Sequence, residues 1–202
     1  MVMTKNIFIF LGPQGSGKST QAEIISKKLK YTHIVESDLL HKFVKKNNKE
    51  SKMVKDMMLK GEMVPFEISC DILFEKINSL KSKNIIVDGF PRTIDQVHVF
   101  DYYLYKKKHN FKGIVYINLP KKECIKRMLL RKREDDKLNV IKKRLEIYFK
   151  KTKVVLDYYN KKGKVIKING NQKIEAVTFE IEKKIKSIKW NYGRRENNWK
   201  HK

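Results

Sequence analysis

Short apolar runs alternate with amphipathic stretches along most of this chain. Ile7 to Leu11 is a continuous apolar run, as expected of a parallel strand that is buried on both faces. The run Ile85-Ile86-Val87, closed by Asp88, has the same character. Shorter strands are expected at Ile34-Val35, Gly113 to Leu119 and Val165 to Ile168. Strands that alternate with helices predict a doubly wound α/β fold around a parallel sheet.

The helices are indicated by apolar side chains three or four positions apart. Ala22, Ile25 and Leu29 form one such stripe, and residues 39–80 contain several helices with breaks at 47–48, 61 and 65. Further helices are expected around residues 97–104, 121–131, 137–159 and 174–189. The pattern stops at Trp190, so we interpret residues 1–189 as one domain and 190–202 as a basic tail.

Composition excludes several classes of protein. A chain of 202 residues with 41% hydrophobic residues can form a sizeable core, whereas a disordered chain would be more polar. No apolar run approaches the roughly 18 residues of a membrane-spanning helix. The two cysteines, Cys70 and Cys124, are far apart, which argues against a disulfide scaffold. No secretory signal follows Met1, so we expect a cytoplasmic protein.

The net charge of +25 invites a nucleic-acid interpretation. Lysines supply 40 of the 47 basic residues and occur in every segment, which is more typical of solvated surfaces than of one binding face. We therefore expect only weak and unspecific binding of nucleic acid. The seven arginines are more informative, because arginine presents a planar fork that binds phosphate bidentately.

Residues 12–19, G-P-Q-G-S-G-K-S, match the phosphate-binding loop G-x-x-x-x-G-K-[ST] and lie between a buried strand and a helix. In such a loop the glycines let backbone amides converge on phosphate oxygens, and the helix N-terminus adds its positive end. Lys18 would reach the outer phosphates of a nucleoside triphosphate. The hydroxyl of Ser19 would ligate Mg²⁺.

Two further segments contain charged residues that fit the binding of Mg²⁺ and phosphate. Asp88 ends a buried strand, at the sheet edge where α/β proteins bind ligands, and is a candidate for holding Mg²⁺ through water. Arginines concentrate at positions 127, 131, 133 and 144, beside the acids at 135 and 136. Surface ion pairs would stabilise little, whereas a clamp around transferring phosphates explains why arginine gathers here.

Together these segments resemble the nucleoside monophosphate kinases, adenylate kinase most of all. The resemblance rests on G-P-Q-G-S-G-K-S-T, D-G-F-P-R-T and R-x-x-x-R followed by R-x-D-D, and covers about residues 5–186. It implies a central five-stranded parallel sheet and transfer of a phosphoryl group from Mg-ATP to a monophosphate. It also implies a helical monophosphate-binding insertion at about 36–65 and a very short lid at about 131–136.

The resemblance also implies a role for individual positions. ATP would be bound by Gly12, Gly15, Ser16, Gly17, Lys18, Ser19, Thr20 and Arg127, the last by stacking on the base. The monophosphate would be bound by Ser37, His41, Met63, Val64, Gly89, Arg92, Gln96, Arg133 and Arg144. The catalytic set would be Lys18, Arg92, Arg127, Arg131, Arg133 and Arg144, acting by positioning and charge stabilisation rather than as bases.

The chain departs from the family pattern at three places. The family segment S-T-G-D-L-L-R reads V-E-S-D-L-L-H over residues 35–41, so Glu36 replaces a threonine and His41 replaces an arginine that holds the monophosphate. Only Lys132 separates Arg131 from Arg133, which leaves a lid shorter than the family's short form. The tail from Trp190 has no counterpart in the family.

We expect AMP to be the acceptor, because Thr93 and Gln96 resemble the adenylate branch of the family. A UMP/CMP kinase is the alternative within the class. A catalytically impaired relative that binds nucleotides or acidic partners is the alternative outside it. The expected partners are ATP and a nucleoside monophosphate, with no membrane association and a monomeric chain.

Overall fold

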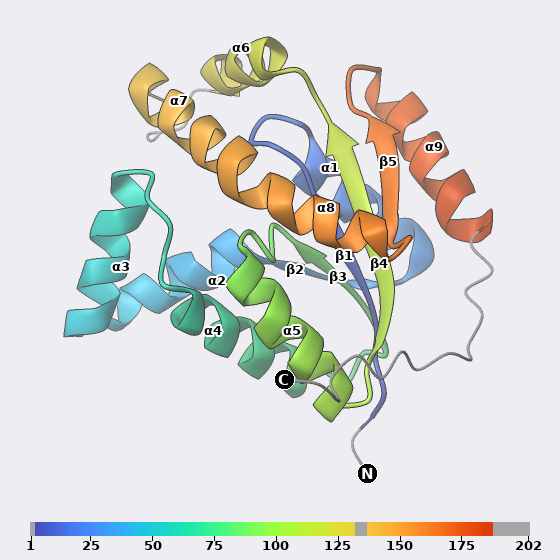
Figure 1. Ribbon diagram of the computed structural model, residues 1–202, viewed down its shortest axis with the longest axis horizontal. Coiled ribbons are helices and arrows are strands. Elements are labelled where there is room, and N and C mark those ends of the chain that lie inside the picture. Colours follow the sequence, from blue (N-terminus) through green and yellow to red (C-terminus); the bar gives the residue numbers. More distant parts are fainter. Residues whose placement is uncertain (1–2, 132–136, 188–202) are drawn as a thin grey trace.

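The computed structural model describes residues 3–131 and 137–187, and these residues form one sheet of five parallel strands in the spatial order β2-β3-β1-β4-β5. Figure 1 shows the sheet at the centre of the molecule, with helices on both sides. The strands are β1 Asn6–Leu11, β2 Thr32–Val35, β3 Asn84–Asp88, β4 Asn110–Asn118 and β5 Val165–Asn169. The predicted doubly wound five-stranded parallel sheet is confirmed.

The helices follow the predicted pattern with two differences. They are α1 Lys18–Leu29, α2 Glu36–Phe43, the 3₁₀ turn η1 Val44–Lys46, α3 Lys49–Leu59, α4 Phe66–Ser79, α5 Ile94–Lys106, α6 Lys121–Arg131, α7 Leu138–Ile147, the π-helical turn η2 Tyr148–Thr152, α8 Lys153–Lys161 and α9 Ile174–Ser187. The single helix expected over 137–159 is thus interrupted by a π turn and continues to Lys161. β4 starts at Asn110 rather than at Gly113, because Asn110 and Phe111 pair with the first two residues of β1.

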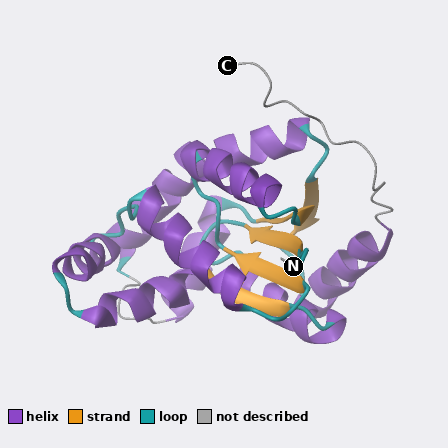
Figure 2. Cartoon of the chain, turned by 90° about the horizontal axis from the view of Figure 1, so that it is seen from below, coloured by secondary structure: helices purple, strands orange, loops and turns teal. Residues whose placement is uncertain are grey.

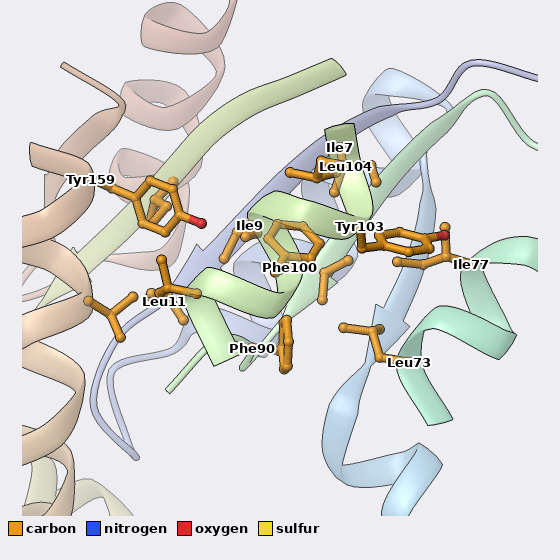
Figure 3. Packing of buried hydrophobic residues seen from close by; sticks show 14 of the residues in the cluster. Ile7, Ile9, Leu11, Leu73, Ile77, Phe90, Phe100, Tyr103, Leu104 and Tyr159 are labelled. Atoms are coloured by element: carbon orange, nitrogen blue, oxygen red, sulfur yellow. The ribbon is translucent and has the colours of Figure 1, made fainter. Parts of the chain in front are cut away.

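The two faces of β1 separate the two main halves of the core, because successive strand side chains point to opposite sides. Ile7, Ile9 and Leu11 pack with apolar side chains of α4, α5 and α8, part of which Figure 3 shows. Phe8 and Phe10 pack with α1 and α9 on the other face. Figure 2 shows the strands enclosed between these helical layers. β1 is consequently buried on both sides, as its continuous apolar sequence predicts.

Two smaller clusters hold the helices that extend beyond the sheet. Leu119, Cys124 and Met128 pack with Ile141 and Leu145, which joins α6 to α7 near the carboxyl ends of the strands. Leu40, Phe43 and Val54 join α2 to α3, and partly buried side chains of α4 pack on them. Within the described residues no helix is long and apolar enough to cross a membrane.

His109, which connects α5 to β4, is a buried histidine at the end of the sheet opposite the phosphate-binding loop. Its Nδ1 accepts the backbone N–H of Lys5 at 3.4 Å, and its Nε2 lies 3.5 Å from the hydroxyl of Tyr103. Burial, helped by the positive charges of Lys5 and Lys107, lowers the pKa of His109 to about 4. The imidazole is therefore neutral in the folded protein at pH values where an unfolded histidine is protonated.

We predict that this histidine makes folding sensitive to mild acid. Because the unfolded state takes up the proton near pH 6.5 and the folded state only near the lowered pKa, stability falls as the pH drops from about 6.5 to 4. This one group changes the free energy of unfolding by at most about 1.4 kcal/mol per pH unit. Urea unfolding of His109→Gln over this interval should show a shallower loss than wild type. The exposed-site variant His98→Gln should keep the wild-type slope, and an unchanged slope in His109→Gln would contradict the assignment.

Candidate active site

The phosphate-binding loop and Asp88 lie at the same edge of the sheet because β1 and β3 are parallel neighbours. Phe10 is paired with Asp88 in the ladder, and the N–H of Gly89 donates to the carbonyl of Phe10 at 3.1 Å. Residues 12–17 leave β1 one residue further on and lead directly into α1. The loop and the carboxylate predicted from separate motifs are thus brought together.

Close packing explains the glycines of the loop. A Cβ on Gly12 would lie 2.5 Å from the hydroxyl of Ser16, and a Cβ on Gly15 would lie 2.7 Å from the carbonyl of Cys124. Gly15 and Gly17 also have φ of 83° and 86°, which L residues with a side chain rarely adopt. Gly17 caps α1 without a side-chain hydrogen bond, so the first amides of the helix remain available to an anion.

Lys18 and Asp88 form the charged centre of the site. Lys18 Nζ lies 4.0 Å from Asp88 Oδ1, and His33 Nε2 lies 3.8 Å from Asp88 Oδ2. Burial lowers the pKa of Lys18 even though the Asp88 charge opposes this. Burial works to raise the pKa of Asp88, but Lys18, His33 and Ser19 outweigh it and lower the pKa. Asp88 is therefore a buried, ionised carboxylate.

The residues expected to hold Mg²⁺ fit that ion. Neither carboxylate oxygen of Asp88 accepts a hydrogen bond from the described residues, although Asp88 is only 2% exposed. Ser19 and Thr20 lie in the exposed first turn of α1. A hydroxyl and a carboxylate beside a phosphate-binding loop supply the oxygen donors that Mg²⁺ prefers.

Arg127 lies on the wall of a cavity beside the phosphate-binding loop. The cavity has a volume of about 340 Å³, at the lower end of the range for small-molecule sites. Arg127 donates from Nε to Glu123 at 3.1 Å and from Nη1 to the carbonyl of Gly170 at 3.2 Å. The cavity is lined by Gly15, Ser16, Gly17, Thr20, Gln21, Arg127, Gly170, Gln172, Lys173, Ile174 and Val177. Its position next to the loop suits the base and sugar of a bound nucleotide.

Arg92 is held by backbone and side-chain groups on several sides. Its Nε donates to the carbonyl of Gly89 at 2.6 Å, and its backbone N–H donates to Gln96 Oε1 at 2.6 Å. Its Nη2 lies 2.8 Å from Oε2 of Glu36, the first residue of α2. Thr152, in the π turn, donates from its hydroxyl to the carbonyl of Arg92 at 3.2 Å. These contacts place the guanidinium beside Lys18 at the sheet edge.

Of the remaining arginines, Arg144 connects α7 to the helical insertion and Arg131 ends α6. Arg144 donates from Nη2 to the carbonyl of Met58 at 3.1 Å, and its side chain passes within about 3.3 Å of a Cβ built on Gly61. Arg131 is exposed at the end of α6 and contributes to the lowered pKa of Lys18. The predicted site residue Arg133 and the paired acids Asp135 and Asp136 lie outside the described residues.

The other residues expected to bind the monophosphate lie on or next to the insertion. His41 is exposed on α2, and Ser37 in its first turn is half-buried. Met63 and Val64 are half-buried between α3 and α4, where Val64 packs on the cluster of Leu40, Phe43 and Val54. The insertion therefore carries these positions on a small core of its own.

The structure adds two residues that the motifs did not indicate. His33 faces Asp88 from β2, and Thr152 contacts Arg92 from a π turn. The one sequence signal for His33 is a histidine directly before the apolar pair Ile34-Val35. Nothing in the helical pattern of residues 137–159 marked Thr152, because the π turn shifts its register.

Comparisons with known proteins agree with this geometry. The family model described as adenylate kinase matches residues 10–164, well over half of the chain. An adenylate kinase from Dehalococcoides mccartyi is 37% identical over 121 residues, which are 59% of this chain and 56% of that protein. An adenylate kinase from Chlamydia pneumoniae is 36% identical over 131 residues, 64% of this chain and 61% of that protein.

An adenylate kinase from the archaeon Archaeoglobus fulgidus is similar to the same degree, with 36% identity over 125 residues. That match covers 61% of this chain and 58% of the relative. The chain thus spans somewhat more than half the length of the curated relatives it matches.

We predict that Gly15 depends on space as well as on backbone conformation. Gly163 has a similar φ of 63°, but a Cβ there meets nothing within 4 Å, so Gly163→Ala isolates the conformational cost of about 1–2 kcal/mol. Gly15→Ala adds a clash with the Cys124 carbonyl at 2.7 Å and should lose clearly more stability. Urea denaturation of both variants measures the difference. Equal losses would show that the loop can move away from α6 without cost.

Proposed function

The chain belongs to the adenylate kinase family, and from that premise we propose that it transfers the γ-phosphoryl group of Mg-ATP to AMP, giving two ADP. The observation that carries the proposal is the meeting of Lys18, Asp88 and Arg92 at one edge of the sheet. A triphosphate on the loop and a phosphate on Arg92 would face each other there. The partners of the protein in this proposal are its two nucleotides.

We assign the ATP side to the phosphate-binding loop, α1 and Arg127. The open amides before α1 and the ammonium of Lys18 would bind the phosphates, and the 340 Å³ cavity would take the nucleoside with Arg127 against its base. Mg²⁺ would be held by Ser19 and, through water, by Asp88, and would supply charge neutralisation at the transferred phosphoryl group. Asp88 in turn keeps Lys18 oriented toward the phosphates.

We assign the acceptor side to Arg92 and the helical insertion, residues 36–65. Arg92 would bind the acceptor phosphate, assisted by Arg144 and Arg133. Gln96 would contact the base through its amide N–H₂, since its Oε1 already accepts the N–H of Arg92. Gly89, Ser37, His41, Met63 and Val64 would complete the walls, in positions that α2 and the segment before α4 bring to this side of the molecule.

The reaction requires positioning rather than a strong base. An oxygen of the acceptor phosphate forms a bond to the γ-phosphorus while the bond from that phosphorus to the bridging oxygen of ADP breaks. Lys18, Arg92 and the arginines expected in the lid would balance the negative charge on the transferred group.

A coupled assay with pure protein, Mg-ATP and each of AMP, GMP, UMP and CMP tests the proposal. AMP should give the highest kcat/KM. Preference for UMP or CMP would move the chain to the pyrimidine branch. If none of the four accepts a phosphoryl group but calorimetry detects nucleotide binding, the chain would be a catalytically impaired relative of the family.

We predict that Lys18→Ala lowers kcat at least about a hundredfold, as expected for the loss of a charge that stabilises the transferred phosphoryl group. The variant should keep the wild-type circular dichroism spectrum, because Lys18 is not a member of either main apolar cluster. Lys27→Ala is the matched control, since Lys27 lies exposed on the same helix and pairs with Glu23. Near wild-type turnover of Lys18→Ala would contradict the assignment of the loop.

We predict that His41→Arg tightens AMP binding about 10- to 100-fold, because a charged hydrogen bond to phosphate contributes about 1.5–3 kcal/mol. The ATP KM should not change. Lys42→Arg, at the neighbouring exposed position of α2, serves as control. Calorimetric titration of AMP measures the effect, and equal affinities of all three proteins would mean that position 41 does not reach the acceptor.

A further inference from the structure

The buried carboxylate of Glu36 lies next to Arg92, the arginine to which we assign the acceptor phosphate. Glu36 begins α2 and is 3% exposed, so its charge is almost completely removed from water. Such a group is expensive to bury unless it is paired. Its partner is Arg92, whose Nη2 lies 2.8 Å from Glu36 Oε2.

The pair belongs to a compact group of four charges. A Cβ built on Gly89 would lie 3.2 Å from Arg92 Nη2, 3.8 Å from Glu36 Oε2 and 3.9 Å from Lys18 Cε. Asp88 precedes Gly89 and faces Lys18. Two cations, Lys18 and Arg92, are therefore matched by two carboxylates before any phosphate is bound.

Arg92 is also held by contacts other than the one with Glu36. The Nε of Arg92 is fixed by the carbonyl of Gly89, and its backbone N–H is fixed by Gln96. The carbonyl of Arg92 accepts the hydroxyl of Thr152. None of these three contacts involves Glu36.

A carboxylate and a phosphate compete for the same donors of a guanidinium. With Nε donating to Gly89 and Nη2 beside Glu36, a dianionic phosphate that approaches Arg92 meets a buried negative charge at its side. The two anions repel each other more strongly in this partly buried site than they would in water.

We infer that Glu36 is an internal competitor of the acceptor phosphate: it pairs with Arg92, must share or release this guanidinium when the monophosphate binds, and thereby sets the acceptor affinity. The inference rests on the proposed function, since Arg92 is the acceptor's phosphate ligand only there. Glu36 is thus a determinant of acceptor binding without being a catalytic residue.

The variant Glu36→Gln tests this inference, because it removes the charge and keeps the shape. Calorimetric titration should show AMP binding about tenfold tighter or more, as expected when a guanidinium is freed for a charged hydrogen bond. The AMP KM should fall by a similar factor. The kcat and the ATP KM should stay within about twofold of wild type. Unchanged or weaker AMP binding would overturn the inference, and weaker binding would make Glu36 a positioning residue.

Two further variants control the experiment. Glu182→Gln removes one negative charge from α9, on the opposite face of the sheet, and should leave AMP binding unchanged. Glu36→Asp keeps the charge but withdraws it by one methylene group, and should bind AMP with intermediate affinity. Circular dichroism and thermal unfolding establish that each variant is folded, and Glu36→Asp provides the test if Glu36→Gln is not.

The result separates this inference from the proposed function. Transfer to AMP by wild type with an unchanged AMP KM in Glu36→Gln would leave the function standing and refute the competition. Tighter AMP binding by Glu36→Gln without transfer in either protein would support the competition and refute the activity. If neither protein binds any of AMP, GMP, UMP and CMP, both are refuted.

Discussion

The parallel pairing of β1 with β3 is the constraint on which the rest of the site depends. It sets Phe10 opposite Asp88, so the loop that leaves β1 and the acid that ends β3 emerge side by side. α1 then starts at Lys18, and the segment after β3 brings Arg92 back over the same edge. The core on both faces of β1 enforces this register, because a shift by one residue would exchange the side chains that fill the two apolar clusters.

The same constraint gathers four charges into a partly buried space, where each needs a partner. Lys18 faces Asp88, and Arg92 faces Glu36. The pKa directions reflect this balance: burial lowers the pKa of Lys18 and raises that of Glu36, whereas nearby positive charge lowers that of Asp88 despite its burial. Asp88 is thus the carboxylate best prepared to remain ionised beside a cation.

Much of the fold could be predicted because it depends on local patterns. Five apolar runs gave the five strands, and the breaks at 47–48, 61 and 65 separate real helices. Lys18 in the loop motif and Asp88 at the end of an apolar run could be placed at one edge through general rules of α/β sheets. The contacts of His33, Glu36 and Thr152 could not be predicted in this way. Each joins side chains from elements far apart in sequence, and the π turn that brings Thr152 to Arg92 breaks the helical register on which the prediction relied.

The charge at the acceptor side differs in kind from the charge of the whole chain. A net charge of +25 attracts any polyanion at long range, and salt weakens this attraction over about 8–10 Å. Discrimination among anions must therefore arise at short range, where Glu36 offsets Arg92 and where the resemblance to the family implies an arginine at the position of His41. At the proposed acceptor site, both differences would reduce the positive charge available to a phosphate. A ligand then has to add contacts to its base and sugar to bind well, which favours a complete nucleotide over a bare phosphate.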